Sequence, residues 1–392
     1  MNTKKSDKTL NKTFLLFLGI MLLSIGISFA QNKSEIILGR EVTIKSTTLN
    51  EERVISIYLP NGYDLTSEKY PVLYLLDGRT HFHQATGAVH FLSINRIIPQ
   101  MIVVAIHNVD RNRDFSPVYC ERIPTSGGAK NFLNFLSDEL TKYIDKNYRT
   151  SSFTVLMGHS FGGLFAAYSL LTKPEVFDAY IAISPYLQYG DNDIVKETKN
   201  LLRSNYDSQK YFYMTVGNEP DYFSVLGEFS ALIKEKSNEI IDLKYVKMET
   251  ENHASIPYLS VFNGLRFIFS DWQLPAEKFG LGLSAIDEHY KYVSAKYDFE
   301  IKTPENVINL IGYTFLGNQD IENAIKVFAE NVKRFPLSSN VYDSLGETYE
   351  TNNELELAEK NYQMAYDLGK AQNHRNTEIY RKNLLRVQQK ID

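Results

Sequence analysis

The sequence predicts an α/β fold with a mostly parallel central sheet, followed by a smaller all-helical region. Short apolar runs alternate with segments of helical periodicity between residues 41 and 272. Most of these runs are apolar at every position, as in strands of a parallel sheet that helices cover on both faces. Beyond about residue 301 such runs stop, and a helical pattern with an internal repeat begins. Alternation of strand and helix over ~230 residues indicates a doubly wound sheet.

The N-terminal segment, residues 1–30, is predicted to be a cleaved secretory signal. Lysines precede a mostly apolar run at residues 15–29, and Ser28 and Ala30 supply small residues at its end. A basic start, a short apolar run and small residues before the cleavage point are typical of such signals. An uncleaved anchor is the alternative. No later stretch reaches the ~18 apolar residues of a spanning helix. We therefore expect an exported protein, periplasmic or secreted, with no stable membrane span after cleavage.

The first domain is expected to span residues 31–275. Its strands are predicted at residues 42–44, 54–59, 71–76, 101–106, 153–157, 180–183, 211–216 and 243–248. The last of them alternates apolar and polar residues, which suits a strand nearer the sheet edge. Helical spacing of apolar residues occurs at residues 132–144, 164–171, 225–233 and 259–268. Because ligands bind at the carboxyl ends of strands in such sheets, the loops that follow the strands should hold the functional residues.

A repeat follows a linker expected at residues 276–300. The aligned positions are Ile311-Gly312 with Leu345-Gly346, Phe315 with Tyr349, Asn318 with Asn352, Ala324 with Ala358, and Phe328 with Tyr362. The common offset of 34 residues and the order of glycine, aromatic, alanine and aromatic residues resemble the tetratricopeptide repeat. Residues 301–392 are therefore predicted to form two such repeats and a capping helix. Two repeats bury little surface alone, so they should pack on the first domain, on that helix or on a protein partner.

Composition excludes several classes of function. The formal net charge is −5, which argues against a nucleic-acid-binding surface. Cys120 is the single cysteine, so the chain has no internal disulfide and no zinc site built from several thiolates. We interpret Cys120 as a small buried apolar residue, with a thiol nucleophile as the weaker alternative.

The motif Gly158-His-Ser-Phe-Gly162 follows the apolar run at residues 153–157 and precedes a helical segment. A strand, G-x-S-x-G and a helix form a sharp turn that exposes the serine hydroxyl at the helix N-terminus. The small residues at both ends make the turn sterically feasible. Ser160 is therefore the candidate nucleophile.

A serine nucleophile needs a histidine base, and in this arrangement the base follows the serine and an acid in the chain. Of the eight histidines, four precede the motif and two lie in the linker or the helical region. His159 adjoins Ser160 and should point away from the turn. His253 remains, in the loop after the last predicted strand, and is the candidate base.

The acid is expected in the loop after the strand at residues 211–216. Glu219 and Asp221 are both available there. The acid holds the histidine tautomer and offsets the charge of the imidazolium. We prefer Glu219 because it is closer to the strand end, and the other carboxylate is expected to cap the following helix.

Two backbone N–H groups should stabilise the oxyanion. One is that of Phe161, the residue after the nucleophile. The other should come from the loop after the strand at residues 71–76, from Arg79 or, as the alternative, from Gly78.

Residues 41–272 resemble the putative esterase family of α/β hydrolases, which includes esterase D, feruloyl esterases and siderophore esterases. The residues that carry the resemblance are Tyr74-Leu-Leu-Asp-Gly78, the stretch at 108–117, Gly158-His-Ser-Phe-Gly-Gly163, Ser184-Pro185 and Asn252-His253. The resemblance implies an α/β-hydrolase fold, with Ser160 and His253 as nucleophile and base. It also implies an oxyanion hole from the amides of Phe161 and Arg79.

The leading hypothesis is hydrolysis of a carboxylic ester through an acyl-enzyme, without a metal or organic cofactor. The alternatives are acyl transfer by the same residues and a partner-binding scaffold that uses the helical repeats. His81, Arg111 and Arg113 lie on segments expected to be loops facing the site. They are candidates for binding a small-molecule ester such as a siderophore, although solvated loop residues are the equal alternative.

Overall fold

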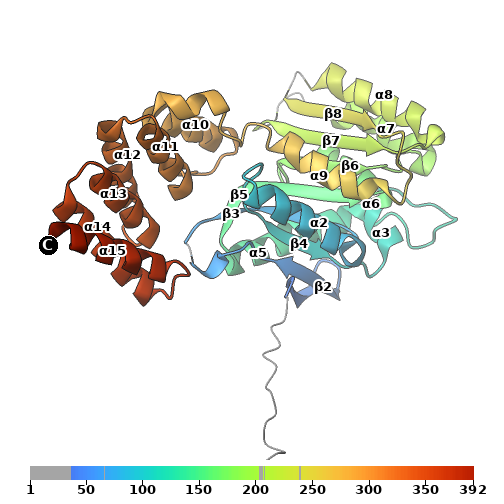
Figure 1. Ribbon diagram of the computed structural model, residues 1–392. Helices are drawn as coiled ribbons and strands as arrows, with labels where there is room; N and C mark the ends of the chain where they lie inside the picture. The colour runs from blue at the N-terminus through green and yellow to red at the C-terminus, as the bar shows by residue number, and fades with distance from the viewer. Residues whose placement is uncertain (1–36, 66, 203–205, 207, 238–239) are drawn as a thin grey trace, which may run out of the picture. The chain divides into compact units, whose positions relative to one another are not determined.

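The computed structural model describes residues 37–65, 67–202, 206, 208–237 and 240–392, and in this part of the chain one eight-stranded sheet dominates (Figure 1). Its strand order is β1-β2-β4-β3-β5-β6-β7-β8. The strands are β1 (Arg40–Ser46), β2 (Glu51–Tyr58), β3 (Tyr70–Leu75), β4 (Ile102–Ile106), β5 (Thr150–His159), β6 (Ala179–Ile183), β7 (Lys210–Val216) and β8 (Ile241–Lys247). The first two pair antiparallel and the other six are mutually parallel. The predicted fold class is confirmed.

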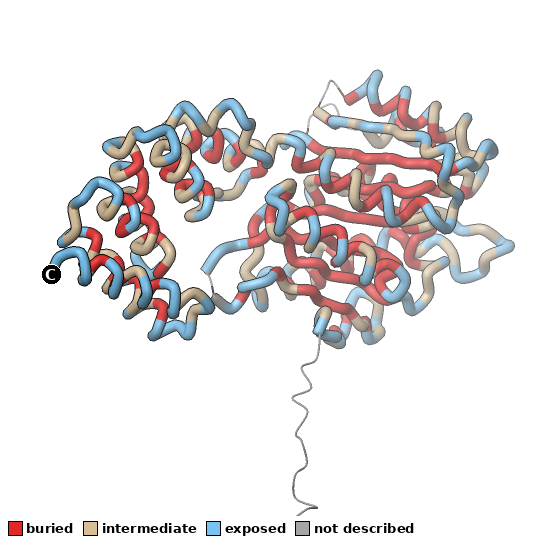
Figure 2. Tube along the Cα trace, viewed as in Figure 1, coloured by how far each residue is buried: buried red, intermediate tan, exposed pale blue. Residues whose placement is uncertain are grey.

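The burial pattern explains why these strands could be recognised in the sequence. Every residue of β3, β4, β6 and β7 is buried, so the runs are apolar on both faces (Figure 2). Strand β8 lies at the end of the sheet and alternates between buried or half-buried and exposed residues over much of its length. The alternation predicted for an edge strand is therefore confirmed.

Helices cover both faces of the sheet. Those of this region are α2 (Gly78–Ile94), α3 (Arg111–Phe115), α4 (Ala129–Phe135), α5 (Thr141–Asn147), α6 (Phe161–Thr172), α7 (Tyr189–Leu201), α8 (Pro220–Lys236) and α9 (Ile256–Ile268). Short helical turns are η1 (Tyr63–Leu65) and η2 (Leu136–Leu140). Helices α2 and α9 pack together across one face, while on the opposite face α7 contacts both α6 and α8 (Figure 1).

Two adjacent parallel strands set the position of the candidate site. Strand β3 pairs with β5, with Leu75 opposite Met157. The loops that follow both strands therefore open at the same carboxyl edge of the sheet, where α/β folds bind their ligands. Strand β7 lies two strands from β5, so the loop after it opens at the same edge.

The segment expected as a linker, 276–300, contains η3 (Ala276–Leu281) and α10 (Leu283–Lys296). After α10 the buried ring of Tyr297 packs on Phe153 and Phe269, and its hydroxyl donates to the carbonyl of Ile268. The remaining elements are α11 (Glu305–Gly317), α12 (Ile321–Arg334), α13 (Ser339–Thr351), α14 (Leu355–Ala371) and α15 (Thr377–Ile391). The prediction of an all-helical C-terminal region is confirmed.

The predicted signal, residues 1–30, lies outside the described residues. Within the described part of the chain, we find no helix that is both long and apolar enough to cross a membrane.

Candidate active site

Ser160 sits at the turn between β5 and α6, in a backbone conformation that residues with a side chain rarely adopt. Its φ is 59° and its ψ is −113°. The turn is tight, because a Cβ added at Gly158 would lie 2.1 Å from the carbonyl oxygen of Gly162. A Cβ at Gly163 would lie 2.9 Å from the Cα of Pro185. The expected strand, turn and helix are present, and strained backbone of this kind is concentrated at functional sites.

His253 and Glu219 form a direct contact at the same edge of the sheet. His253 lies in the loop between β8 and α9, and its Nδ1 is 2.5 Å from Oε1 of Glu219. A carboxylate can only accept, so Nδ1–H donates. In the neutral ring this tautomer leaves Nε2 as an acceptor. The Glu219 side chain is only 11% exposed, which makes the interaction stronger than one in bulk water.

The second oxygen of Glu219 fixes the carboxylate from the other side. Its Oε2 accepts from the Oγ of Ser184 at 2.6 Å and from the backbone N–H of Gly217 at 3.1 Å. Glu219 occupies the N-cap position of α8 but makes no side-chain cap. The carboxylate is therefore held toward His253 rather than toward its own helix.

Asp221, the other candidate acid, lies elsewhere. It is exposed in the first turn of α8, where a negative charge favours the helix dipole. Asp221 lies inside the helix rather than at its N-cap. The prediction that the unused carboxylate caps the helix is therefore wrong. The structure brings Glu219 to His253 and leaves Asp221 at the surface.

The predicted oxyanion donors are first-turn residues of two neighbouring helices. Phe161 begins α6, and Gly78 and Arg79 begin α2. The first N–H groups of a helix have no acceptor within it and carry the positive end of its dipole. The two helix starts are close, because a Cβ at Gly162 would lie 3.4 Å from Oδ2 of Asp77. This edge of the sheet can therefore stabilise a negative charge.

Three histidine rings form a row beside the turn. The ring of His159 lies 4.5 Å from that of His253 and 5.6 Å from that of His81, measured between centroids. The expectation that His159 points away from the site is wrong. Burial, followed by the neighbouring His253 and His81, lowers the pKa of His159 to about 3, so it stays neutral at physiological pH.

His81 belongs to helix α2 and not to a loop, which corrects the expectation from sequence. Its side chain is buried, and Nδ1 lies 2.5 Å from Nε2 of Gln84. Burial lowers the pKa of His81. Among the described residues, no three His, Cys, Asp or Glu side chains are arranged to hold a metal ion.

Arg111 and Arg113 also lie on a helix, the short α3, rather than on a loop. Arg111 donates to Asp77, with Nε 2.6 Å from Oδ1 and Nη2 3.0 Å from Oδ2. Arg113 is paired with Glu51 at 2.6 Å and with Asp114 at 2.8 Å. Neither guanidinium is a freely solvated loop group, and a direct contact of either with substrate stays a prediction.

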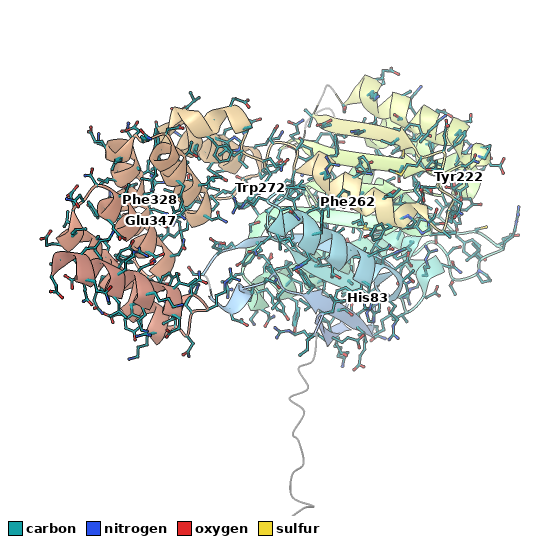
Figure 3. All side chains as sticks on the ribbon, viewed as in Figure 1. His83, Tyr222, Phe262, Trp272, Phe328 and Glu347 are labelled. Atoms are coloured by element: carbon teal, nitrogen blue, oxygen red, sulfur yellow. The ribbon has the colours of Figure 1, made fainter. Side chains whose placement is uncertain are left out.

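Sequence reasoning missed an aromatic cluster next to the candidate triad. Tyr186 lies 5.3 Å from Phe161 and 6.1 Å from Tyr222, and Tyr189 is 5.4 Å from Phe161. Tyr222 lies at the start of α8 (Figure 3), and its ring centroid is 6.0 Å from that of His253. Burial, followed by the charge of Glu219, raises the pKa of Tyr222 to about 12. The rings offer a surface on which an apolar or aromatic group can pack.

Cys120 is half-buried and packs against the edge of the main core, and its backbone N–H bonds the Oγ of Ser126. It takes the apolar environment expected for it, although burial is incomplete.

Comparison with known proteins identifies the family. The model of the family described as "Putative esterase" matches residues 46–253, which is over half of the chain. Ferri-bacillibactin esterase BesA of Bacillus subtilis is 28% identical over 258 residues, 58% of this chain and 89% of that protein. A siderophore triacetylfusarinine C esterase of Aspergillus fumigatus is 26% identical over 241 residues, 52% of this chain and 82% of that protein.

The fold is shared with a solved structure, an IroE-like serine hydrolase from Shewanella oneidensis. The TM-score is 0.67 and the sequence identity 25%, over 76% of this chain and 99% of that one. The sheet and its helices are therefore those of an α/β hydrolase.

Proposed function

Because the chain belongs to the putative esterase family and is an esterase, we propose that it hydrolyses carboxylic esters through an acyl-enzyme on Ser160, with His253 as base and Glu219 as acid. The observation that carries this proposal is the 2.5 Å contact between His253 and Glu219. It lies at the sheet edge where Ser160 is held in a sharp turn with positive φ. A nucleophile on such a turn, with an oriented histidine nearby, suits acyl transfer chemistry.

In the proposed mechanism, the hydroxyl of Ser160 attacks the ester carbonyl while Nε2 of His253 takes its proton. Glu219 holds the ring and stabilises the imidazolium that forms. The N–H groups of Phe161 and Arg79, or Gly78 in place of Arg79, bind the oxyanion. His253 then protonates the leaving alcohol, and an activated water releases the acyl group. None of these steps uses a metal or an organic cofactor.

We further propose small-molecule esters of the siderophore type as substrates, with other carbohydrate-linked or aromatic esters as the alternatives. One relative is named as a ferri-bacillibactin esterase and another as a siderophore triacetylfusarinine C esterase. The aromatic cluster beside His253 would accommodate an aromatic acyl group. His81 and Arg113 remain proposed substrate contacts. A panel of acetyl, feruloyl and siderophore esters would rank these classes by kcat/KM.

The decisive experiment compares the wild type with Ser160→Ala. We expect turnover of p-nitrophenyl acetate and labelling by a fluorophosphonate probe in the wild type, and neither in the variant. Circular dichroism should show an unchanged fold. Residual turnover in Ser160→Ala at the wild-type level would exclude Ser160 as nucleophile. Product analysis with added alcohols separates hydrolysis from acyl transfer.

We also propose that residues 301–392 form tetratricopeptide-like repeats that bind a protein partner. Supporting this, Gly312 faces Phe328 as Gly346 faces Tyr362. An added Cβ would come within 2.5 Å of the first ring and 2.9 Å of the second. The same close packing thus recurs between α11 and α12 and between α13 and α14. If binding of a partner by the repeats were the protein's whole function, the fluorophosphonate probe would label no serine.

Export to the periplasm or the medium, after cleavage of residues 1–30, is likewise a proposal. N-terminal sequencing of the protein recovered from outside the cytoplasm would test it.

A further inference from the structure

Arg111 joins two loops that come from different strands of the sheet. Its guanidinium binds both carboxylate oxygens of Asp77, which lies in the short connection between β3 and α2. The same Nη2 donates to the carbonyl oxygen of His159, the residue before Ser160, at 3.1 Å. One side chain thus holds the start of α2 and the turn before α6.

The backbone at Asp77 needs this support. Asp77 has a φ of 52° and a ψ of 45°, a left-handed conformation that non-glycine residues rarely adopt. Its carboxylate is 7% exposed and also accepts from Nδ2 of Asn108 at 2.6 Å. Bidentate pairing with a guanidinium adds fixed geometry as well as energy. The positions of Gly78 and Arg79, which follow immediately, depend on that geometry.

The guanidinium itself is confined. Its carbon lies 5.4 Å from the ring centroid of Phe115 and 5.6 Å from that of Phe161. Contacts at these distances are attractive because the ring faces are electronegative. Phe161 also supplies the other predicted oxyanion N–H. Its side chain therefore packs on the same guanidinium that orders the loop at Asp77.

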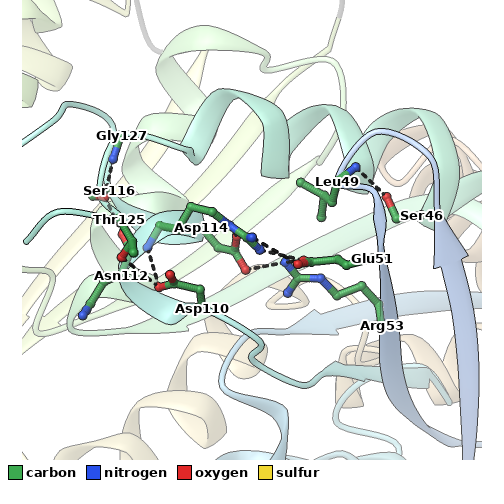
Figure 4. A network of polar contacts seen from close by, with 11 residues as sticks. Ser46, Leu49, Glu51, Arg53, Asp110, Asn112, Asp114, Ser116, Thr125 and Gly127 are labelled. Carbon is green, nitrogen blue, oxygen red and sulfur yellow. Dashed lines mark hydrogen bonds and ion pairs between the residues drawn. The ribbon is translucent and has the colours of Figure 1, made fainter.

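Helix α3, which carries Arg111, is anchored to the antiparallel side of the sheet. Asp114 accepts from Arg53 of β2 at 2.6 Å, and both side chains are 1% exposed. Arg113 bridges Asp114 and Glu51. Figure 4 shows Arg53 beside Asp114 and Glu51. A helix of five residues is unstable alone, so these ion pairs hold in place the helix from which Arg111 extends to the site.

We propose that Arg111 is a positioning residue, which acts through Asp77 and the His159 carbonyl to hold the two oxyanion N–H donors at a fixed separation. The inference rests on the proposed function of Ser160 and extends it. Nε and Nη2 are occupied by protein acceptors, so these two groups order the site rather than contact the substrate. Arg111 then contributes to the transition state, where the oxyanion forms, and little to binding of the ground-state ester.

The test measures kcat and KM for p-nitrophenyl acetate in Arg111→Gln and Arg111→Lys. Loss of one oxyanion donor costs ~10²–10³ in kcat, so we expect about a 10²-fold fall in Arg111→Gln with KM changed less than ~3-fold. Lysine keeps the charge but not the bidentate geometry, so Arg111→Lys should recover part of kcat. A trifluoromethyl ketone, which forms a tetrahedral adduct, should lose affinity by the same factor as kcat.

Arg149→Gln is the matched structural control. Arg149 also donates to backbone carbonyls, those of Tyr63 and Glu68, and stacks on a ring, but it precedes the opposite end of β5. We expect a similar loss of thermal stability with kcat unchanged.

The outcomes are distinguishable. A rise in KM with kcat retained would overturn the inference and make Arg111 a substrate contact. Equal kcat losses in Arg111→Gln and Arg149→Gln would overturn the inference, because Arg111 would then contribute only to the stability of the fold. Activity that survives Ser160→Ala would instead overturn the proposed function, and the inference with it.

Discussion

Replacing Glu219 by glutamine should reduce catalysis strongly, while replacing Asp221 by asparagine should not. Glutamine keeps the size of the side chain and can still accept from the hydroxyl of Ser184. It removes the negative charge next to Nδ1 of His253. Its amide can also donate to Nδ1 and stabilise the wrong tautomer.

The magnitude follows from the geometry of the pair. With the charge centres ~4 Å apart and an effective dielectric constant of ~20, the attraction between carboxylate and imidazolium is about 4 kcal/mol. The charge on His253 exists only after proton transfer, so this energy is lost from the transition state. Each ~1.4 kcal/mol is a factor of ten, which gives a fall of about 10³ in kcat/KM.

The assay is kcat/KM for p-nitrophenyl acetate at pH 7 in Glu219→Gln, Glu219→Asp and Asp221→Asn. Asp221 is exposed, so its variant should retain activity within about twofold, since surface charges are screened. Glu219→Asp shortens the reach of a 2.5 Å contact and should fall between the other two. A tenfold or smaller loss in Glu219→Gln, or a larger loss in Asp221→Asn, would refute the assignment of the acid.

Two predictions concern stability. Asp114→Asn should cost about 3 kcal/mol in urea unfolding, because it removes the buried carboxylate from Arg53 and leaves that guanidinium paired with Glu51 alone, whereas Glu51→Gln, at a 19% exposed position, should cost less. Equal costs in the two variants would contradict the role assigned to burial. The second prediction is pH-dependent. Hydrogen bonding from Arg386, together with bonds from Lys390 and Tyr362, lowers the pKa of Glu350 from its ordinary 4.5 to about 2. A lowered folded-state pKa contributes stability that is present above pH ~4.5 and is lost as the pH falls toward 2. Because Arg386 and Lys390 are about half exposed, we expect Glu350→Gln to cost only about 1–2 kcal/mol at pH 7. Hydrogen exchange of α15 should report this loss, and the difference from the wild type should vanish near pH 2. A difference that persists there would show that packing, rather than charge, holds the helix.

The sheet could be predicted because its constraints are local. Strands buried on both faces must be apolar throughout, and β3, β4, β6 and β7 leave that mark in the sequence. The turn at Ser160 could also be predicted from the sequence, because close backbone contact requires glycine at position 158. Both requirements act within a few residues of the chain.

Other parts leave no such local pattern. Helix α2 carries three histidines on different sides, of which His81 is buried and His83 is exposed, so its apolar periodicity is weak. Helix α3 has five residues, which is too short for any period to be visible. The sequence therefore predicts loops at both places and puts His81, Arg111 and Arg113 on them, whereas the structure has helices there.

Spacing favours Glu219 over Asp221 but does not decide between them, because both are carboxylates that closely follow β7. Pro220 begins α8, so Glu219 precedes the helix with extended φ and Asp221 lies within its first turn. The deciding partner is Ser184, 35 positions away in the chain and brought close by the pairing of β6 with β7. Only the tertiary fold supplies that information.

The geometry at Ser160 is secured by two kinds of constraint with different consequences for mutation. The glycines at 158 and 163 are required by steric exclusion, so any larger residue there disturbs the fold itself. Arg111 is required by long-range polar contacts, which a substitution removes without forcing atoms together. Changes of the first kind should therefore abolish folding and activity together. Changes of the second kind should separate them, and that separation is the property by which a positioning residue is distinguished from a structural one.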